Sequence, residues 1–299
     1  MYKIRVFSRG ARKNGEVPTM YRYRYYDKYN MKLLIFERLE NAGVKHCFTT
    51  RHGGVSSGAC GSLNMSRSRD SDVRNVEENI RRLAESLDVD YNKVTAVPQV
   101  HGCKIKAVDL KNCGAGVSKE SFGEGYDGMI TNIPGITLMT LHGDCVPVFL
   151  YDCEKKAVGM VHSGWRGTAE RIAACAVYAM SREYGTDPAN VYAAIGPSID
   201  KDCFEVDHPV YEKLLKAFPS VEYDRTLAEK QKNAEKWNIS LPELAARALI
   251  ECGVKRENID ISGICTCCAE NAGDYFSHRR SKGADGIMAG AICLGMRRV

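Results

Sequence analysis

The sequence predicts a single domain of mixed α/β or α+β class. Apolar runs of strand length recur along the chain, and residues with helical spacing separate some of them. The chain shows neither a strict strand–helix alternation nor an internal repeat. At 299 residues it can bury a large core, and its hydrophobic content of 44% is ordinary for a globular protein.

The first half of the chain is expected to begin irregularly, up to about residue 30. Within it, tyrosine and arginine alternate over 21–26, as in an edge strand. A strand or short helix is expected at 32–42 and a strand at 44–51. The best-defined helix is 72–87, because its apolar residues recur at helical spacing opposite a charged face.

The second half is expected to open with strands at 94–101, 126–131, 137–142, 146–152 and 157–162. A helix should follow over about 168–184, with Thr168 as its N-cap. A strand and turn at 191–199, helices at 209–218 and 241–252, and strands at 259–265 and 287–294 complete the prediction.

The apolar runs, the cysteine count and the net charge of the chain limit the classes of function that it can have. No apolar run approaches the ~18–20 residues that span a bilayer, and the N-terminus lacks the apolar core of a secretory signal, so a cytoplasmic protein is expected. Thirteen cysteines, an odd number, argue against a disulfide framework. The net charge of +5 and the basic residues near both ends suit an anionic small substrate, a nucleic acid or a solvated surface.

Three predicted strands end in reactive residues beside glycines, at His101-Gly102, Gly143-Asp144-Cys145 and His162-Ser163-Gly164. His101, Cys145 and His162 would suit zinc, and three protein ligands leave a fourth position for water or substrate. Alternatively, Cys145 could be a nucleophile with His162 as its base, as in cysteine hydrolases or deamidases. Metal content separates the two hypotheses.

Two further groups are candidates. Arg51, Arg166, Arg279 and Arg280 could bind an anion, and Arg166 precedes the start of the predicted helix, where N–H groups also favour one. Cys265-Thr266-Cys267-Cys268 is interpreted as structural thiols or an oxidisable pair, because adjacent cysteines do not easily bind one tetrahedral ion and no second pair lies at zinc-ribbon spacing.

Seven motifs in order resemble the YfiH family, also called the laccase-domain or polyphenol oxidase family, whose members are now regarded as purine nucleoside phosphorylases. They are Thr49-Thr50-Arg51-His52-Gly53-Gly54-Val55-Ser56, Ser62-Leu63-Asn64, Gln99-Val100-His101-Gly102, Asp144-Cys145-Val146-Pro147-Val148, His162-Ser163-Gly164-Trp165-Arg166-Gly167-Thr168, Ile195-Gly196-Pro197-Ser198-Ile199 and Phe276-Ser277-His278-Arg279-Arg280.

The resemblance implies a single domain of the cytotoxin/YfiH-like layered type, with 31–299 as the catalytic domain and 1–30 as an N-terminal extension. It implies zinc held by the residues at His101, Cys145 and His162. It also implies phosphorolysis of adenosine, inosine, guanosine and methylthioadenosine, and deamination of adenosine. An older assignment to the family is copper-dependent oxidation of phenols, but seven histidines cannot build several histidine-rich copper centres.

The motif positions suggest roles. Arg51 and Arg166 would hold phosphate, and Cys145, His162, Asp144 and Arg166 would form the catalytic group, with Asp144 as a proton carrier. Substrate contacts are expected from Arg51, Ser56, Asn64, Gln99 and Arg279. The expected partners are purine nucleosides and phosphate.

The sequence departs from the family pattern at two places. His142-Gly143 precede Asp144 where the family has a small residue, so His142 would either join the site or pack. Ala284-Asp285-Gly286 replaces the family's Thr-Gly-Arg, which affects substrate preference. A different class of function, a nucleic-acid or partner-binding module using the basic segment 1–30, is the remaining alternative.

Overall fold

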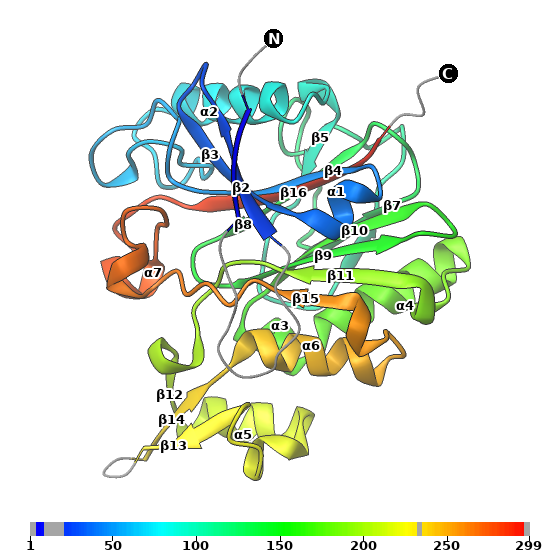
Figure 1. Cartoon of the computed structure of the whole chain (residues 1–299), viewed down its shortest axis with the longest axis vertical. Coiled ribbons are helices and arrows are strands. Elements are labelled where there is room, and N and C mark those ends of the chain that lie inside the picture. The colour runs from blue at the N-terminus through cyan, green and yellow to red at the C-terminus, as the bar shows by residue number, and fades with distance from the viewer. Residues whose placement is uncertain (1–3, 9–20, 232–234, 296–299) are drawn as a thin grey trace.

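The computed structural model describes residues 4–8, 21–231 and 235–295, and two large sheets stacked face to face form its centre (Figure 1). The first sheet has seven strands and is antiparallel except for its last pair. Its strands, in spatial order, are β1 (Ile4–Ser8), β2 (Tyr21–Tyr26), β3 (Met31–Phe36), β4 (Val44–Thr49), β16 (Met288–Leu294), β8 (Thr137–His142) and β5 (Val94–Ala96).

The second sheet has six strands and carries parallel pairs at both edges. Its strands, in spatial order, are β15 (Ile259–Ile261), β11 (Val191–Ile195), β9 (Val146–Asp152), β10 (Ala157–Ser163), β7 (Gly128–Thr131) and β6 (Ile105–Ala107). Every residue of β9 and β10 is buried, so both strands lie inside the layered core.

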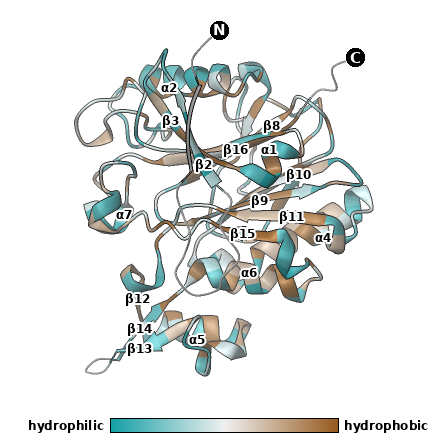
Figure 2. Ribbon diagram, viewed as in Figure 1, coloured by the Kyte–Doolittle hydropathy of each residue, from teal (hydrophilic) through white to brown (hydrophobic). Residues whose placement is uncertain are grey.

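Helices cover the outer face of each sheet, which gives four layers (Figure 1). Strand β3 shows why: Met31, Leu33 and Ile35 pack against α2 (Val73–Ser86), whereas Leu34 and Phe36 point into the space between the sheets. The six-stranded sheet packs on α4 (Ile172–Tyr184) and α6 (Leu241–Glu251). Figure 2 shows hydrophobic residues concentrated along the central strands and on these helices.

A small third sheet lies at the lower end of Figure 1. It pairs β12 (Glu205–Asp207), β14 (Lys236–Ile239) and β13 (Ala228–Lys230), and α5 (His208–Ala217) packs beside it. Trp237 of β14 stacks on Tyr211 of α5 with ring centroids 4.4 Å apart. The remaining helices are short: α1 (Glu37–Asn41), α3 (Trp165–Ala169) and α7 (His278–Ser281).

Most predicted elements are found, and α2 illustrates why. The Asp72 side chain accepts the N–H of Arg74 at 2.9 Å and caps the helix.

The predicted helix over 168–184 was wrong at its start. The chain forms α3 first, and Arg171 then adopts a left-handed conformation (φ 59°) before α4 begins. Thr168 lies inside α3, where its hydroxyl donates to the carbonyl of Gly164.

The predicted strand at 21–26 is found as β2, but it is not an edge strand, because it pairs with both β1 and β3. The expectation of an irregular start up to about residue 30 was therefore wrong for the two described strands, β1 and β2. Arg22 and Arg24 both form ion pairs with Glu40, so these two basic side chains are engaged within the fold. The predicted boundary at residue 30 falls in the turn between β2 and β3 and stays a prediction. Most of the basic residues noted near the two ends lie outside the described side chains. Among the described helices, none has the length and apolar character needed to cross a membrane.

Candidate metal centre

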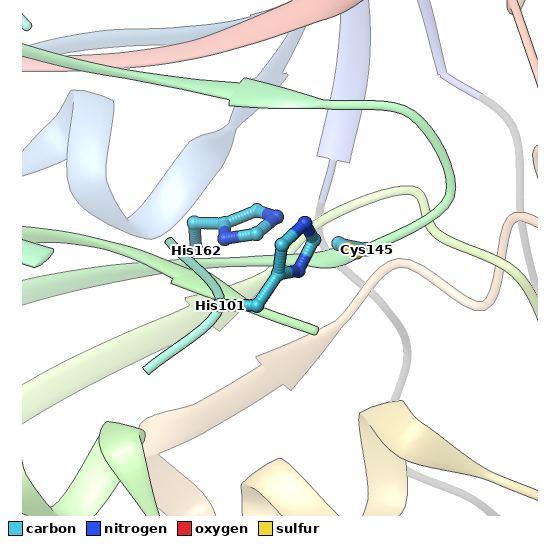
Figure 3. Close-up of side chains that lie close together, drawn as sticks. All are labelled: His101, Cys145 and His162. Atoms are coloured by element: carbon cyan, nitrogen blue, oxygen red, sulfur yellow. The ribbon is translucent and has the colours of Figure 1, made fainter. Parts of the chain in front are cut away.

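Three segments far apart in sequence meet where the two sheets adjoin. His101 lies in the loop after β5, Cys145 in the turn between β8 and β9, and His162 near the end of β10. One ligand atom from each lies within 4.8 Å of those of the other two. Figure 3 shows the two imidazole rings and Cys145 side by side, and the ring centroids of His101 and His162 are 4.9 Å apart.

The turn that carries Cys145 passes from one sheet to the other, because β8 belongs to the seven-stranded sheet and β9 to the six-stranded sheet. The crossing is tight, and Asp144 adopts a left-handed conformation with φ 79°. Such a conformation costs energy for a residue other than glycine unless contacts hold it. The fold therefore places the Cys145 thiol at the junction of the two sheets.

Asp127 organises two of the three candidate ligands, and sequence reasoning missed it. Its Oδ1 atom accepts the His162 Nδ1–H at 2.9 Å and the backbone N–H of His101 at 2.9 Å. Its Oδ2 atom accepts the N–H groups of Val100 (3.1 Å) and Gly102 (2.7 Å). His162 thus keeps its Nε2 atom for an ion, in the carboxylate–histidine arrangement common at metal sites.

The electrostatics of the site favour an ion pair between the Cys145 thiolate and the His162 imidazolium. Burial alone would raise the pKa of Cys145, but the charge of His162 and hydrogen bonds from His101 and His162 lower the pKa to about 6. Burial alone would lower the pKa of His162, but the Cys145 thiolate and Asp127 raise it. A thiolate is the form that binds a metal or attacks an electrophile.

His142 packs in the core instead of joining the three ligands. Its Nε2 atom lies 2.8 Å from the Thr140 hydroxyl, and its Nδ1 atom lies 3.1 Å from the carbonyl of Cys145. Both ring nitrogens therefore have protein partners. Burial, together with the charge of His162, holds the pKa of His142 well below its usual value.

A cavity of about 560 Å³ opens onto the three ligands. This volume lies within the roughly 300–1,000 Å³ typical of small-molecule sites. One part of its wall is apolar and is formed by Val76, Ile80, Val97, Pro98, Met139, Leu141 and Ile287. Another part is polar and basic and is formed by Ser66, Arg67, Ser68, Arg69 and His278.

Arg67 and Arg69 were also missed by sequence reasoning. Both lie in the loop before α2, where serine and arginine alternate in Ser66-Arg67-Ser68-Arg69. That alternation is the signal that could have identified them. Gln99 was predicted and does line the cavity; its side chain also bonds the backbone of Leu141 through both amide atoms.

Four of the five predicted substrate contacts do not line this cavity: Arg279 lines a smaller cavity described below, and the other three are Arg51, Ser56 and Asn64. The Arg51 guanidinium donates to the carbonyls of Gly61 and Ala272 and lies over Phe276. Ser56 donates to Asp70, and Asn64 donates to the carbonyl of Ser66 at 3.0 Å. These side chains hold the loops behind the cavity together.

The carboxylate of Asp144 is engaged by three protein donors. It accepts the hydroxyls of Thr266 (2.6 Å) and Ser277 (3.0 Å) and the backbone N–H of Arg279 (2.6 Å). The Arg279 guanidinium bonds the carbonyls of Cys203 and Glu205, and Arg280 bonds those of Thr266 and Tyr275. Asp144 therefore fixes the position of the α7 segment relative to Cys145.

A smaller cavity of about 190 Å³ also borders Cys145. Trp165, at the start of α3, lines it together with Phe204 and Arg279. Arg166 is exposed and lies over the Trp165 ring, 4.3 Å from its centroid. Arg166 was predicted to precede the start of a helix, but it lies inside the first turn of the five-residue α3, and the longer helix α4 begins only at Ile172.

Comparison with known proteins identifies the family of this chain. Residues 45–295 match the family described as "Multi-copper polyphenol oxidoreductase laccase". The chain belongs to this family. The resemblance stated from the seven motifs is thereby confirmed.

Two relatives of this chain are named as purine-converting enzymes. The chain is 34% identical over 252 residues to the purine nucleoside phosphorylase YlmD of Geobacillus stearothermophilus, covering 84% of this chain and 90% of that one. It is 31% identical over 257 residues to the adenosine deaminase RL5 of an unknown prokaryotic organism, covering 86% and 94% of the two chains. The crystal structure of the Bacillus licheniformis hypothetical protein YfiH superposes with a TM-score of 0.81 at 31% identity, covering 88% and 96% of the two chains. The layered fold predicted from the sequence is thus confirmed.

The residues present fit a metal ion. Two imidazoles and one thiolate suit Zn²⁺ or copper, and the adjoining cavity leaves room for a further ligand. Within the described chain, histidines contribute to one ligand cluster only. This ligand set matches a single-ion centre, whereas laccase-type copper chemistry needs several histidine-rich centres.

Proposed function

We propose that this protein is a zinc-dependent purine nucleoside phosphorylase that also deaminates adenosine. The observation that carries the proposal is the His101–Cys145–His162 cluster, which opens onto a cavity of small-molecule size. The names of the relatives supply the substrate class. The proposed substrates are adenosine, inosine, guanosine and methylthioadenosine, and the proposed compartment is the cytoplasm, where cysteine ligands stay reduced.

The two kinds of cavity wall suggest how a nucleoside and phosphate would bind. The apolar lining residues, which include Val97, Pro98, Met139 and Leu141, offer a nonpolar surface for a purine ring. Arg67 and Arg69 line the basic part of the wall, where phosphate would bind. Each guanidinium also donates to backbone carbonyls, that of Arg67 to Gly116 and Val117 and that of Arg69 to Gly283, so phosphate would use their remaining N–H groups. We assign the phosphate to these two residues in preference to Arg51 and Arg166, because neither of the latter lines the cavity.

The residues around the ligands would orient the reaction. A zinc ion bound there supplies a Lewis acid that activates water or polarises a substrate group. Asp127 fixes the tautomer and direction of His162. We assign Asp144 a positioning role in place of the predicted proton-carrying role, because its carboxylate already accepts three hydrogen bonds.

The direct test incubates purified, metal-analysed protein with adenosine and phosphate. Free adenine and ribose 1-phosphate are expected from phosphorolysis, and inosine from deamination. His101→Ala and Cys145→Ala should abolish all of these products. Cys153→Ala is the matched control, because Cys153 is a half-buried thiol that does not line the cavity. Activity that survives both chelation and Cys145→Ala would refute the proposal.

A cysteine hydrolase or deamidase remains the second candidate, because Cys145, His162 and Asp127 also form a thiolate–imidazolium–carboxylate array. The two functions differ in their need for metal. Metal-free protein that stays active and is inactivated by iodoacetamide would favour the hydrolase. Loss of activity on chelation, restored by Zn²⁺, would favour the phosphorylase.

A further inference from the structure

A second group of side chains with metal-ligand spacing lies outside the site described above. The sulfur atoms of Cys203, Cys265 and Cys268 lie within 4.8 Å of one another, and those of Cys203 and Cys268 are 3.6 Å apart. Cys203 ends the 3-10 turn Lys201–Cys203, and the other two lie in the chain after β15. All three are free thiols, one buried and two half-buried.

The structure changes the interpretation of the cysteine-rich segment. Sequence reasoning considered the adjacent pair Cys267-Cys268 and found no second pair. The useful spacing is instead Cys265-x-x-Cys268, a common pattern at zinc sites. The third thiol comes from Cys203, which the fold brings in from a separate turn.

We propose that Cys203, Cys265 and Cys268 form a second, structural metal site for a thiophilic cation of the Zn²⁺ class. Thiolates about 2.3 Å from a tetrahedral zinc ion lie roughly 3.8 Å apart. The 3.6 Å separation of Cys203 and Cys268 is close to that value. Two of the thiols are half-buried, so solvent can supply the fourth ligand.

The surroundings suit metal-bound thiolates. The backbone N–H of Asp200 points at the Cys265 sulfur at 3.4 Å, as N–H groups do toward ligating sulfurs. The positive Arg279 guanidinium bonds the carbonyl of Cys203 at 3.1 Å and would offset the excess negative charge.

The position of this site gives it a structural role beside the first centre. Thr266, between the two cysteines of the Cys-x-x-Cys pair, donates to Asp144, which precedes the candidate ligand Cys145. Arg279 links the carbonyl of Cys203 to the same Asp144 carboxylate through its side chain and its backbone N–H. An ion on the three thiols would therefore tie together the segments that hold the Cys145 turn.

Zinc content of the reduced, full-length protein tests the proposal, which does not depend on the proposed activity. The parent should bind two equivalents of Zn²⁺. His101→Ala/Cys145→Ala should retain one, and Cys203→Ser/Cys268→Ser should also retain one. Cys153→Ser, the control outside both clusters, should retain two. A Cys203→Ser/Cys268→Ser variant that binds as much zinc as the parent would overturn the site.

A cobalt titration keeps the test valid if the serine variant fails to fold. The His101→Ala/Cys145→Ala variant leaves the three thiols intact, so one equivalent of Co²⁺ should produce thiolate charge-transfer absorption in the near ultraviolet. Absence of that band from the folded variant would overturn the proposal. Recovery of a Cys203–Cys268 disulfide from protein purified with zinc would also overturn it, and would show an oxidisable pair instead.

Discussion

The Asp127 Oδ1 atom lies 2.9 Å from the His162 Nδ1 atom, and the same buried carboxylate also accepts the backbone N–H of His101. A single side chain thus orients one candidate ligand through its ring and another through its main chain. Burial alone would raise the pKa of Asp127, but His162 and the backbone N–H groups lower it, so the group stays ionised.

Asp127→Asn should weaken zinc binding by roughly 10–100-fold, because the ligand orientation depends on this carboxylate. The amide nitrogen would face N–H donors, which should cost about 1–3 kcal/mol of unfolding free energy. Chelator competition and urea unfolding measure the two effects. Asp109→Asn is the control, because Asp109 is an exposed loop residue whose bonds asparagine can also accept. Unchanged zinc affinity in Asp127→Asn would contradict the assignment.

Gly164→Ala should obstruct the metal centre without disturbing the backbone. A Cβ at residue 164 would lie 2.8 Å from His101 Nδ1 and 3.1 Å from Cys145 Sγ, while its φ of −73° suits alanine. Zinc affinity is expected to fall by roughly tenfold or more, with less than about 1 kcal/mol lost in stability. Gly273→Ala, where a Cβ meets nothing within 4 Å, should leave zinc affinity unchanged. Equal affinities for the two variants would argue against a centre at this position.

Asp144→Asn and Asp144→Ala together separate positioning from proton transfer. Asparagine tolerates the left-handed backbone. Its amide oxygen can accept the Arg279 N–H while its amide nitrogen donates to the Thr266 hydroxyl, so a positioning role predicts a kcat within about tenfold of the parent. A proton carrier would instead lose roughly 10²–10⁴-fold in Asp144→Asn. Asp144→Ala should lose much more activity than Asp144→Asn. Comparable large losses in both variants, with zinc content unchanged, would restore the proton-carrying role.

The contribution of Asp274 to the free energy of unfolding should be lost at acid pH. The hydrogen bond from His52 lowers its pKa, burial opposes this, and Lys32 lowers it further, to about 2. Because the folded pKa is depressed, the stabilisation is present above the unfolded pKa of about 4 and is lost as the pH falls towards 2. Asp274→Asn should therefore cost about 1–2 kcal/mol at pH 7 and almost nothing at pH 2. Urea unfolding across that range measures the difference.

The control for Asp274 is Asp88→Asn. Asp88 pairs with Lys45, but its side chain is 93% exposed, and such surface pairs contribute about 0–1 kcal/mol. Its stability difference from the parent should therefore be small throughout the same pH range. A pH-independent loss in Asp274→Asn would show that the residue acts through packing and not through its charge.

Local patterns explain what the sequence could predict. The Asp72 cap and the apolar spacing of α2 both lie within one short stretch of sequence, so the helix was predicted correctly. The three candidate ligands were identified because each lies at the end of a strand-like run, beside a turn that contains glycine. The break at Arg171 was missed, because nothing in the local sequence requires a left-handed arginine between α3 and α4.

Residues whose roles depend on tertiary pairing were harder to identify. Asp127 contacts the 100–102 loop and His162 only because β10 pairs with β7, which follows Asp127 in the chain. Arg51 was predicted to bind an anion, yet the fold surrounds its guanidinium with carbonyl oxygens. Cys203 joined Cys265 and Cys268 through a contact that no spacing rule in one segment can show.

The chain contains two tryptophans, Trp165 beside Cys145 and Trp237 in the small third sheet. Trp237→Phe would keep an aromatic ring stacked on Tyr211 and leave one indole in the molecule. All tryptophan fluorescence would then arise next to the Cys145 cavity. Occupancy of the first centre could be followed optically during a titration, without any substrate or coupled assay.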